Sequence, residues 1–536
     1  MASSISTDSS AFEESLHEYP CHFTWNLEDK CDRDFKTVVE YIDHHIRYNP
    51  EQMPVPAIAL KAYLYMSSLK GNDKPRPTKA LKLLDRALKT NGAKSSRQNG
   101  QNGERVVLLA NKAWVHLKLG ERDKVESLID ELDQMYPLLS NLKEARAYVD
   151  AHKAFACQWF SRSKYGEAIE CYKKALAVFP SNVDWLFGYT RFLEKTEARS
   201  QSSNDGVSPV TEIELSLRKI LECNPGHGLA RVFLARRLAD KGSTMEAEHQ
   251  VEEALKIDGN NFVVVQRAGE VYRKMSKLDI ALELLEEAKD SESDSSFTFR
   301  QIGCVYKDKY YKSKGKKDKT NLSTALQYLE KAVEVDSSNF LAKCDVASVR
   351  SSLGHTGEAR TMYSQLVQTS NADDRALACF YFGEFLHRQR ENEVNVIEQY
   401  KNAIRADPDG YGGQKAVKKL REKIQKRLAT DENDFDALKL LAWIHKKTGF
   451  IDSACFFYEK AYRLHETEEL SLTLAKLYIK AVDHENARTY IDIIYRSKPE
   501  HYTKLMGQLD VVQKKNLNEM GTLKRLADDI PPLPAY

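Results

Sequence analysis

Positive charge gathers in one short stretch of the chain, from Tyr306 to Thr320. The stretch holds seven lysines, at positions 307, 309, 312, 314, 316, 317 and 319, and two aspartates, whereas the formal net charge of the whole chain is only +2. Such a cluster is suited to steering an anion toward a binding groove. The alternative is a solvated flexible loop, and the sequence leaves both interpretations open.

Basic side chains also recur at helix positions that we expect to face one side of the fold. These positions hold Lys153, Arg236, Gln266, Glu270, Arg273, Arg300 and Lys307, and aromatic side chains lie between them in the sequence, at Trp159, Phe160, Tyr165, Trp185, Tyr189 and Tyr272. Ammonium and guanidinium groups beside aromatic faces suit the phosphates and unstacked bases of single-stranded nucleic acid. The alternative is structural: aromatic residues at these spacings also pack between helices, and single basic residues on helices also pair with glutamates.

A repeated helix pair must position these residues. The pattern Ala247, Val251, Ala254 returns as Ala281, Leu285, Ala288, a period of 34 residues, and the same period separates Ala325 from Ala359. Small residues let two antiparallel helices approach closely, and a larger residue one turn further on fills the space between them. A period of 34 residues is that of the tetratricopeptide repeat.

The sequence therefore predicts an all-α fold, a tetratricopeptide-repeat superhelix or α-solenoid of about nine or ten helix pairs, whose concave surface carries the function. We expect four parts: an N-terminal segment with the first helix at 1–56, an N-terminal and central repeat array at 57–409, a linker helix with C-terminal repeats at 410–500, and a tail at 501–536. Between Ala281 and Ala325 the gap is 44 residues, so about ten residues are inserted in that repeat, and the lysine-rich stretch belongs to its elongated turn and the flanking helix ends.

Several classes of function are disfavoured by composition and motifs. No run of eighteen apolar residues occurs, which argues against a membrane protein. Nine scattered cysteines without metal-ligand spacing indicate reduced thiols in a cytoplasmic protein, and no metal or other cofactor is expected. No catalytic or nucleotide-binding motif is found, so we do not expect an enzyme. Net charge near zero argues against a protein that coats nucleic acid indiscriminately, so any anion site must be local.

Particular stretches of the chain resemble one family. The heptapeptide "CHFTWNL" at 21–27, ahead of the repeats, resembles that of the interferon-induced proteins with tetratricopeptide repeats. Five further stretches are similar to the same family: "YLYMSSLKGND" at 63–73, "KYGEAIECYKKALAVFPSN" at 164–182, "FGYTRFLEK" at 187–195, "VYRKMSKLDIALELLEEA" at 271–288 and "SSFTFRQIGCVYK" at 295–307. The resemblance implies a cytoplasmic antiviral effector that holds the 5′ end of viral-type RNA, triphosphorylated or incompletely methylated at the cap, in a tunnel and blocks its translation. Possible partners are paralogous family members and the translation initiation machinery.

Some of the family's RNA-contacting positions are matched in this chain. The resemblance places Tyr165, Lys195, Arg273 and Gln301 at such positions, with Lys195 in place of an arginine, and Arg300 stands where the family usually has histidine. Two positions depart from the pattern. Trp159 replaces a phosphate-binding lysine, and Gln266 replaces an arginine, with Arg267 beside it but turned one step around the helix.

Two functions compete at this stage. The first is a single-stranded RNA sensor that reads 5′ phosphates and blocks translation, for which the candidate residues are Lys153, Trp159, Tyr165, Lys195, Arg236, Gln266, Arg267, Arg273, Arg300, Gln301 and Lys307. The second is a protein-interaction scaffold of innate immunity without 5′-end-specific RNA binding. The first requires Lys153, Lys195, Arg236, Arg273 and Arg300 to converge on one cavity, without being neutralised by neighbouring acids.

Overall fold

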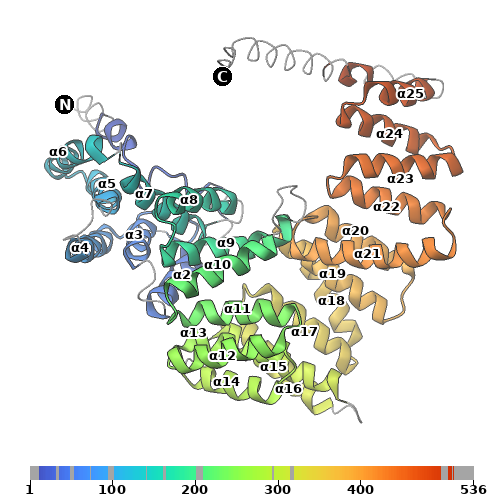
Figure 1. Cartoon of the computed structure of the whole chain (residues 1–536), viewed down its shortest axis with the longest axis horizontal. Helices are drawn as coiled ribbons and strands as arrows, with labels where there is room; N and C mark the ends of the chain where they lie inside the picture. Colours follow the sequence, from blue (N-terminus) through green and yellow to red (C-terminus); the bar gives the residue numbers. More distant parts are fainter. Residues whose placement is uncertain are drawn as a thin grey trace, which may run out of the picture. The chain divides into compact units, whose positions relative to one another are not determined.

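The computed structural model of the chain describes residues 11–29, 31, 35–48, 54–72, 74–94, 102–139, 142–160, 164–200, 209–291, 295–313, 319–495, 505–509 and 511. Within these residues every regular element is a helix and no strand is formed (Figure 1). The helices gather into two compact units, Met1–Leu353 and Gly354–Tyr536, which we name unit 1 and unit 2. The four-part division predicted from the sequence stays a prediction.

Unit 1 contains the following helices: α2 (Phe35–Tyr48), α3 (Pro54–Leu64), α4 (Pro77–Lys94), α5 (Asn102–Leu119), α6 (Arg122–Leu139), α7 (Lys143–Cys157), α8 (Tyr165–Val178), α9 (Val183–Ser200), α10 (Pro209–Cys223), α11 (Gly228–Asp240), α12 (Thr244–Asp258), α13 (Phe262–Lys274), α14 (Leu278–Ser291), α15 (Ser296–Lys312), α16 (Lys319–Val335) and α17 (Phe340–Leu353).

Unit 2 contains α18 (Thr356–Leu366), α19 (Ala372–Arg388), α20 (Glu393–Ala406), α21 (Tyr411–Thr430), α22 (Phe435–Lys447), α23 (Ile451–Leu464), α24 (Glu468–Ala481) and α25 (His484–Tyr495).

Successive helices pack in pairs because a small residue on the first helix faces a large one on the second. A Cβ atom added to Gly269 on α13 would lie 2.7 Å from Leu285 Cγ on α14, and one added to Gly303 on α15 would lie 2.7 Å from Leu329 Cγ on α16. The first helices of neighbouring pairs, α11, α13 and α15, also contact one another in that order. Side chains on these three helices can therefore share one surface.

The turns inside several helix pairs need a residue in the left-handed backbone conformation. Gly242 (φ +85°) joins α11 to α12, and Gly449 (φ +86°) joins α22 to α23. Glycine adopts this conformation without steric cost. In the last pair, Val482 takes the same role with φ +64°, although a β-branched residue is disfavoured there.

The inserted residues near the lysine-rich stretch lengthen helices in addition to the turn. Helix α15 continues to Lys312 and α16 begins at Lys319, so Lys307, Lys309 and Lys312 are helical. The remaining lysines of the stretch, at 314, 316 and 317, lie outside the described residues.

The N-terminal heptapeptide is part of the core of unit 1. The side chains of Cys21, Trp25 and Leu27 are buried, and the His22 ring is fully buried against α5, where its Nδ1 lies 2.8 Å from the Asn111 side-chain amide. This segment therefore supports the fold.

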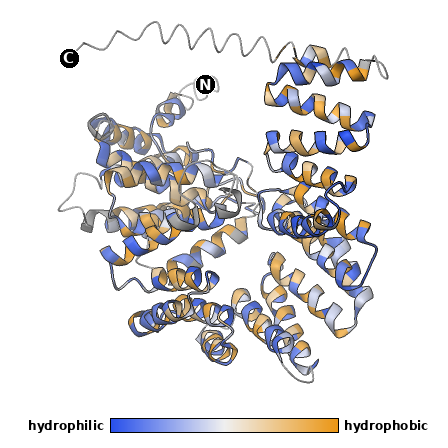
Figure 2. Cartoon of the chain, turned by 45° about the vertical axis from the view of Figure 1, so that its right-hand side comes forward, coloured by the Kyte–Doolittle hydropathy of each residue, from blue (hydrophilic) through white to orange (hydrophobic). Residues whose placement is uncertain are grey.

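Hydrophobic residues are distributed along the helices in both units and alternate with hydrophilic ones around them (Figure 2). This pattern is typical of amphipathic helices that each bury one face against neighbours. In the described part of the chain, none of the helices has the length and apolarity that a bilayer crossing requires.

Candidate nucleic-acid interface

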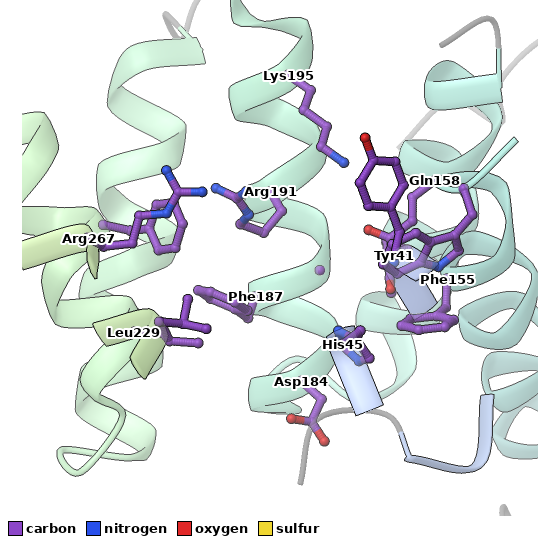
Figure 3. A pocket seen from close by; sticks show the side chains of 15 residues that line it. Tyr41, His45, Phe155, Gln158, Asp184, Phe187, Arg191, Lys195, Leu229 and Arg267 are labelled. Carbon is purple, nitrogen blue, oxygen red and sulfur yellow. The ribbon is translucent and has the colours of Figure 1, made fainter. Parts of the chain in front are cut away.

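A cavity of about 380 Å³ in unit 1 gathers side chains from helices far apart in the sequence (Figure 3). They come from α2, α7, α8, α9, α11, α13 and the turn after α7, and they are Tyr41, His45, Phe155, Gln158, Trp159, Tyr172, Asp184, Phe187, Gly188, Arg191, Lys195, Leu229, Phe233, Val263 and Arg267. The cavity is therefore a product of stacked repeats.

One wall of the cavity is aromatic. The His45 ring lies 5.3 Å from the Phe155 ring and 5.9 Å from the Trp159 ring, measured between centroids, and Phe155 and Trp159 are themselves 5.9 Å apart. Aromatic rings of this kind offer apolar faces on which a planar group can stack.

Three cations face the other side of the cavity. Arg191 and Lys195 are four residues apart on α9 and thus share a helix face, and Arg267 reaches toward Arg191 from α13 (Figure 3). Burial lowers the pKa of Arg191, and the positive charges of Arg267 and Arg236 lower it further, against the opposing effect of Glu194. An arginine stays charged under such a shift, so positive charge is concentrated where water is scarce.

One buried acid holds two of the arginines in place. The Glu194 side chain is 5% exposed, and it accepts a hydrogen bond of 2.6 Å from Arg191 Nη1 and one of 2.8 Å from Arg236 Nη2. Arg267 Nη1 pairs with Glu270 Oε2 at 2.8 Å. These acids orient the guanidinium groups. Because Glu194 pairs with both Arg191 and Arg236, these three side chains together carry one net positive charge.

A single phenyl ring also collects the same arginines. The guanidinium carbons of Arg191, Arg236 and Arg267 lie 4.1, 5.5 and 6.0 Å from the centroid of the Phe233 ring. Lys195 Nζ lies 5.2 Å from the centroid of the Tyr165 ring. Cation–π contacts stabilise positive charge without neutralising it.

A second cluster of cations lies further along the repeats, on α13 and α15, and α17 supplies one of its acids. Arg273 donates hydrogen bonds to Gln301 Oε1 at 3.1 Å and to Asp308 Oδ2 at 2.8 Å. Arg300 Nε and Lys307 Nζ both donate to the Asp345 carboxylate, at 2.8 and 2.5 Å.

The shared carboxylate of this second cluster is buried and stays ionised. Burial raises the pKa of the Asp345 carboxyl, but the charges and hydrogen bonds of Lys307 and Arg300 outweigh that effect and hold the pKa below its usual value. As with Glu194, one acid thus serves two cations.

Lys153 lies in a third group, where the same ratio of charges recurs. Its Nζ is 2.7 Å from Glu167 Oε1, and Lys164 Nζ is 3.5 Å from Glu167 Oε2. The three groups therefore share one design, in which a carboxylate is placed between two cations and leaves a net positive charge.

The prediction that Lys153, Lys195, Arg236, Arg273 and Arg300 converge on one cavity is wrong, because only Lys195 lines it. Lys153, Arg236, Arg273 and Arg300 pair with acids. The acids that pair with Lys153, Arg236 and Arg300 are each shared with a second cation, so pairing does not abolish the positive charge there, whereas Arg273 forms its own pair with Asp308.

The candidate residues from the sequence fall into distinct places. Trp159, Lys195 and Arg267 line the cavity, whereas Tyr165 contacts Lys195 and Arg236 contacts Phe233, both of which line it. Gln266 points between α13 and α15, because its Nε2 donates to Ser295 Oγ and Thr298 Oγ1 at 2.9 and 2.8 Å. The second cluster contains Arg273, Arg300, Gln301 and Lys307, and the third contains Lys153.

Most of the aromatic residues singled out from the sequence serve packing. Phe160, Trp185, Tyr189 and Tyr272 are buried in the core of unit 1. Here the structural alternative was the correct one.

Sequence reasoning missed several residues of the cavity, above all Arg191, His45, Phe155 and Asp184. Arg191 could have been found from its spacing, because it lies one helical turn before Lys195. The others carry no signal of this kind, since α2, α7 and α9 are brought together only by the stacking of repeats.

The architecture is that of a tetratricopeptide-repeat protein, and comparisons with known proteins identify which ones it is similar to. The chain is 27% identical to the antiviral innate immune response effector IFIT1 of Homo sapiens over 482 residues, which are 86% of this chain and 97% of that protein. It is 24% identical to the human interferon-induced protein with tetratricopeptide repeats 2 over 457 residues, 81% and 92% of the two chains. No protein-family model matches the chain.

Solved structures agree with these relatives. The chain matches structures of the human IFIT1 dimer with m7Gppp-AAAA and with PPP-AAAA, with TM-scores of 0.64 and 0.62 and 26% identity, over 85% of this chain and all of the other. The predicted fold class is confirmed. The resemblance to the interferon-induced proteins with tetratricopeptide repeats is also confirmed, and it extends over most of the chain.

Proposed function

We propose that this chain is an interferon-induced antiviral effector that binds the 5′ end of single-stranded RNA in the cavity of unit 1 and blocks translation of that RNA. The observation that carries the proposal is the convergence of Arg191, Lys195 and Arg267 on the cavity, opposite an aromatic wall. The relatives support it, because the matched human IFIT1 structures contain capped or triphosphorylated oligonucleotides.

The chemistry of the cavity divides between its two sides. The three cations receive the 5′ phosphates, because buried guanidinium and ammonium groups form charge-assisted hydrogen bonds with phosphate oxygens. The aromatic wall of His45, Phe155 and Trp159 receives a base or a cap, which stacks on the ring faces. Arg191 and Arg267 in this chain thereby replace the cation that is lost where Trp159 stands in place of a lysine.

The strand continues from the cavity toward the second cluster. Arg273, Arg300, Gln301 and Lys307 contact the phosphates that follow the first nucleotides, and the third group at Lys153 adds positive charge beside the path. Binding in a cytoplasmic protein would remove the 5′ end from the translation initiation machinery, and paralogous family members are the expected protein partners.

Equilibrium binding of a 5′-triphosphorylated tetranucleotide tests the proposal. Each of Arg191→Gln and Lys195→Gln should weaken binding about tenfold to a hundredfold, since a hydrogen bond to a charged group contributes about 1.5–3 kcal/mol. Lys79→Gln, at an exposed lysine of α4, is the matched control and should bind as wild type does. Translation of an RNA with the same 5′ end should recover in the two cavity variants.

The competing function is a protein scaffold, and the acids among the cations favour it to a degree. Under that function the tetranucleotide would bind weakly, and its 5′ chemistry would make no difference. Equal affinities of wild type, Arg191→Gln and Lys79→Gln would therefore favour the scaffold.

A further inference from the structure

Unit 1 contains a further cavity that the proposed function does not use. We name it the N-terminal cavity. Its volume is about 370 Å³, and it lies between α5, α6, α7 and the segment that precedes α2. These three helices lie together in Figure 1, and α5 contacts both α6 and α7. The N-terminal cavity shares no lining residue with the cavity proposed to hold RNA.

The floor of the N-terminal cavity is apolar. Val106 on α5 and Ala145 on α7 are buried, and Val149 lies one turn beyond Ala145 on the same helix face. A Cβ atom added to Gly103 would lie 2.2 Å from the Ala145 carbonyl oxygen, so α5 and α7 approach each other closely at this point. The floor therefore offers apolar side chains to a ligand.

Pro20 lines the cavity from a segment that is held on both sides. Before it, the Tyr19 hydroxyl donates a hydrogen bond to the Asp133 carboxylate of α6. After it, the backbone N–H of His22 donates to Asn111 Oδ1 of α5 at 3.2 Å. The cavity is therefore formed without a ligand, as sites for small molecules usually are.

One carboxylate lines this cavity without a partner. Asp150 on α7 is half-buried, and among the described residues its side chain takes part in neither a hydrogen bond nor an ion pair. Burial raises the pKa of the Asp150 carboxyl, although the charges of Lys174, Lys153 and Arg146 oppose that effect. A cation bound beside this carboxylate would offset the cost of its burial, since an opposite charge favours the ionised form.

The surroundings of Asp150 select the kind of cation. Because Lys174, Lys153 and Arg146 already place positive charge around the carboxylate, a second positive charge on the ligand would be repelled. A polyamine or a lysine-rich peptide is therefore disfavoured. A single ammonium group on an apolar body matches both the carboxylate and the floor, and Tyr136 of α6 adds an aromatic ring that attracts cations. The cavity volume lies within the range of small-molecule sites, about 300–1,000 Å³.

We propose that the N-terminal cavity binds a small primary amine, whose ammonium group pairs with Asp150 and whose apolar body contacts Val106, Ala145 and Val149. The inference goes beyond the proposed function and does not depend on it, because the two cavities are lined by different residues. In a site partly shielded from water, a charge-assisted hydrogen bond of this kind is stronger than at the surface.

Calorimetric titration with phenethylamine tests the proposal. Phenethyl alcohol is the reference ligand, because it has the same apolar body and no charge. Wild type should bind the amine about tenfold more tightly than the alcohol. Asp150→Asn should weaken binding of the amine about tenfold to a hundredfold, the range expected for loss of a hydrogen bond to a charged group, and should leave binding of the alcohol unchanged. Spermidine should bind wild type more weakly than phenethylamine does.

The matched control is Glu144→Gln, which makes the same chemical change at an exposed acid of α7 that does not line the cavity. It should bind phenethylamine as wild type does. Equal affinities of Asp150→Asn and Glu144→Gln for the amine would overturn the site, and so would an alcohol that binds wild type as tightly as the amine. Tighter binding of spermidine would overturn the assignment to a ligand with one charge.

A thermal measurement checks the same site independently. Without ligand, Asp150→Asn should unfold at a higher temperature than wild type, because it removes a half-buried charge that has no partner. Saturating phenethylamine should raise the midpoint of wild type and of Glu144→Gln, and not that of Asp150→Asn, since a ligand stabilises only the protein that binds it. A lowered midpoint of Asp150→Asn without ligand would contradict an unpartnered carboxylate and overturn the proposal.

Discussion

Replacement of the shared acid Glu194 by glutamine should strengthen RNA binding and weaken the fold. In the folded protein this carboxylate accepts hydrogen bonds from Arg191 and Arg236 at 2.6 and 2.8 Å and is almost fully buried. The two arginines bond to different oxygens of Glu194, so glutamine keeps one acceptor oxygen and places an NH2 group, which cannot accept, against the other arginine. Because the substitution also removes the opposing charge from a buried ion pair, we expect a loss of about 3 kcal/mol of unfolding free energy.

The expected gain in RNA affinity follows from the charge that the substitution removes. A phosphate about 8 Å from the Glu194 carboxylate would be repelled by about 2 kcal/mol at an effective dielectric constant near 20. Salt and the open side of the cavity reduce this value, so we expect about 1 kcal/mol, or roughly fivefold tighter binding, at moderate ionic strength.

The assay is a fluorescence titration of a 5′-triphosphorylated tetranucleotide, paired with urea unfolding of the same preparations. Glu253→Gln is the control, since it makes the same chemical change at an ion pair of α12 that lies at the surface. It should leave both quantities unchanged. Weaker RNA binding by a folded Glu194→Gln protein would refute the reasoning, because it would mean that the acid orients the arginines more than it opposes the phosphates.

Three further predictions concern stability. The folded-state pKa of Asp345 is below its usual value, so the stability that its carboxylate contributes is present above about pH 4 and is lost as pH falls through the lower pKa. Asp345→Asn should cost about 3 kcal/mol of unfolding free energy at pH 7, because it leaves Arg300 and Lys307 uncompensated. The difference between the urea midpoints of wild type and this variant should become smaller at pH 3. Burial, with the nearby His152 charge, holds the pKa of His22 well below its usual value, so the stability of the fold should decrease as pH drops below about 6.5. The thermal midpoint of His22→Gln should therefore change less than that of wild type between pH 7.5 and pH 5.5. Midpoints that change in parallel for the two proteins would contradict this prediction. Val482→Gly should stabilise unit 2 by about 0.5–1 kcal/mol in urea unfolding, because glycine tolerates the left-handed turn, and an unchanged or lower midpoint would count against strain at this turn.

The repeat period predicted the fold well because packing enforces it. The spacing of Ala281, Leu285 and Ala288 follows from the contact that Gly269 makes with Leu285, so a local pattern in the sequence reports a local contact in the structure. Positions along one helix were therefore predictable.

The candidate site was predictable only in part, because its geometry depends on several repeats together. Lys195 was found from the resemblance and Arg267 from its place beside Gln266, but the sequence could not show that Gln266 is held by Ser295 and Thr298. Nor could it show that Glu194 stands between two arginines, since Arg236 comes from a helix 42 residues away in the chain.

The sequence also failed to predict how the cations pair with acids. Counting charges along the sequence treats each lysine or arginine as free or neutralised. In the structure Glu194 and Asp345 each serve two cations, so the groups are both fixed in position and still positive. Only three-dimensional contacts distinguish this arrangement from simple ion pairs.

The central claim is that the cavity of unit 1 recognises 5′ phosphates. Its most direct test is the affinity of the wild-type chain for one oligonucleotide carrying a 5′-triphosphate, a 5′-monophosphate, a cap or a 5′-hydroxyl, each measured over a range of salt concentrations. We predict that affinity and salt slope both increase from hydroxyl to monophosphate to triphosphate, since each added phosphate engages another of the three cations. Equal affinities and slopes for the hydroxyl and triphosphate ends would contradict the claim.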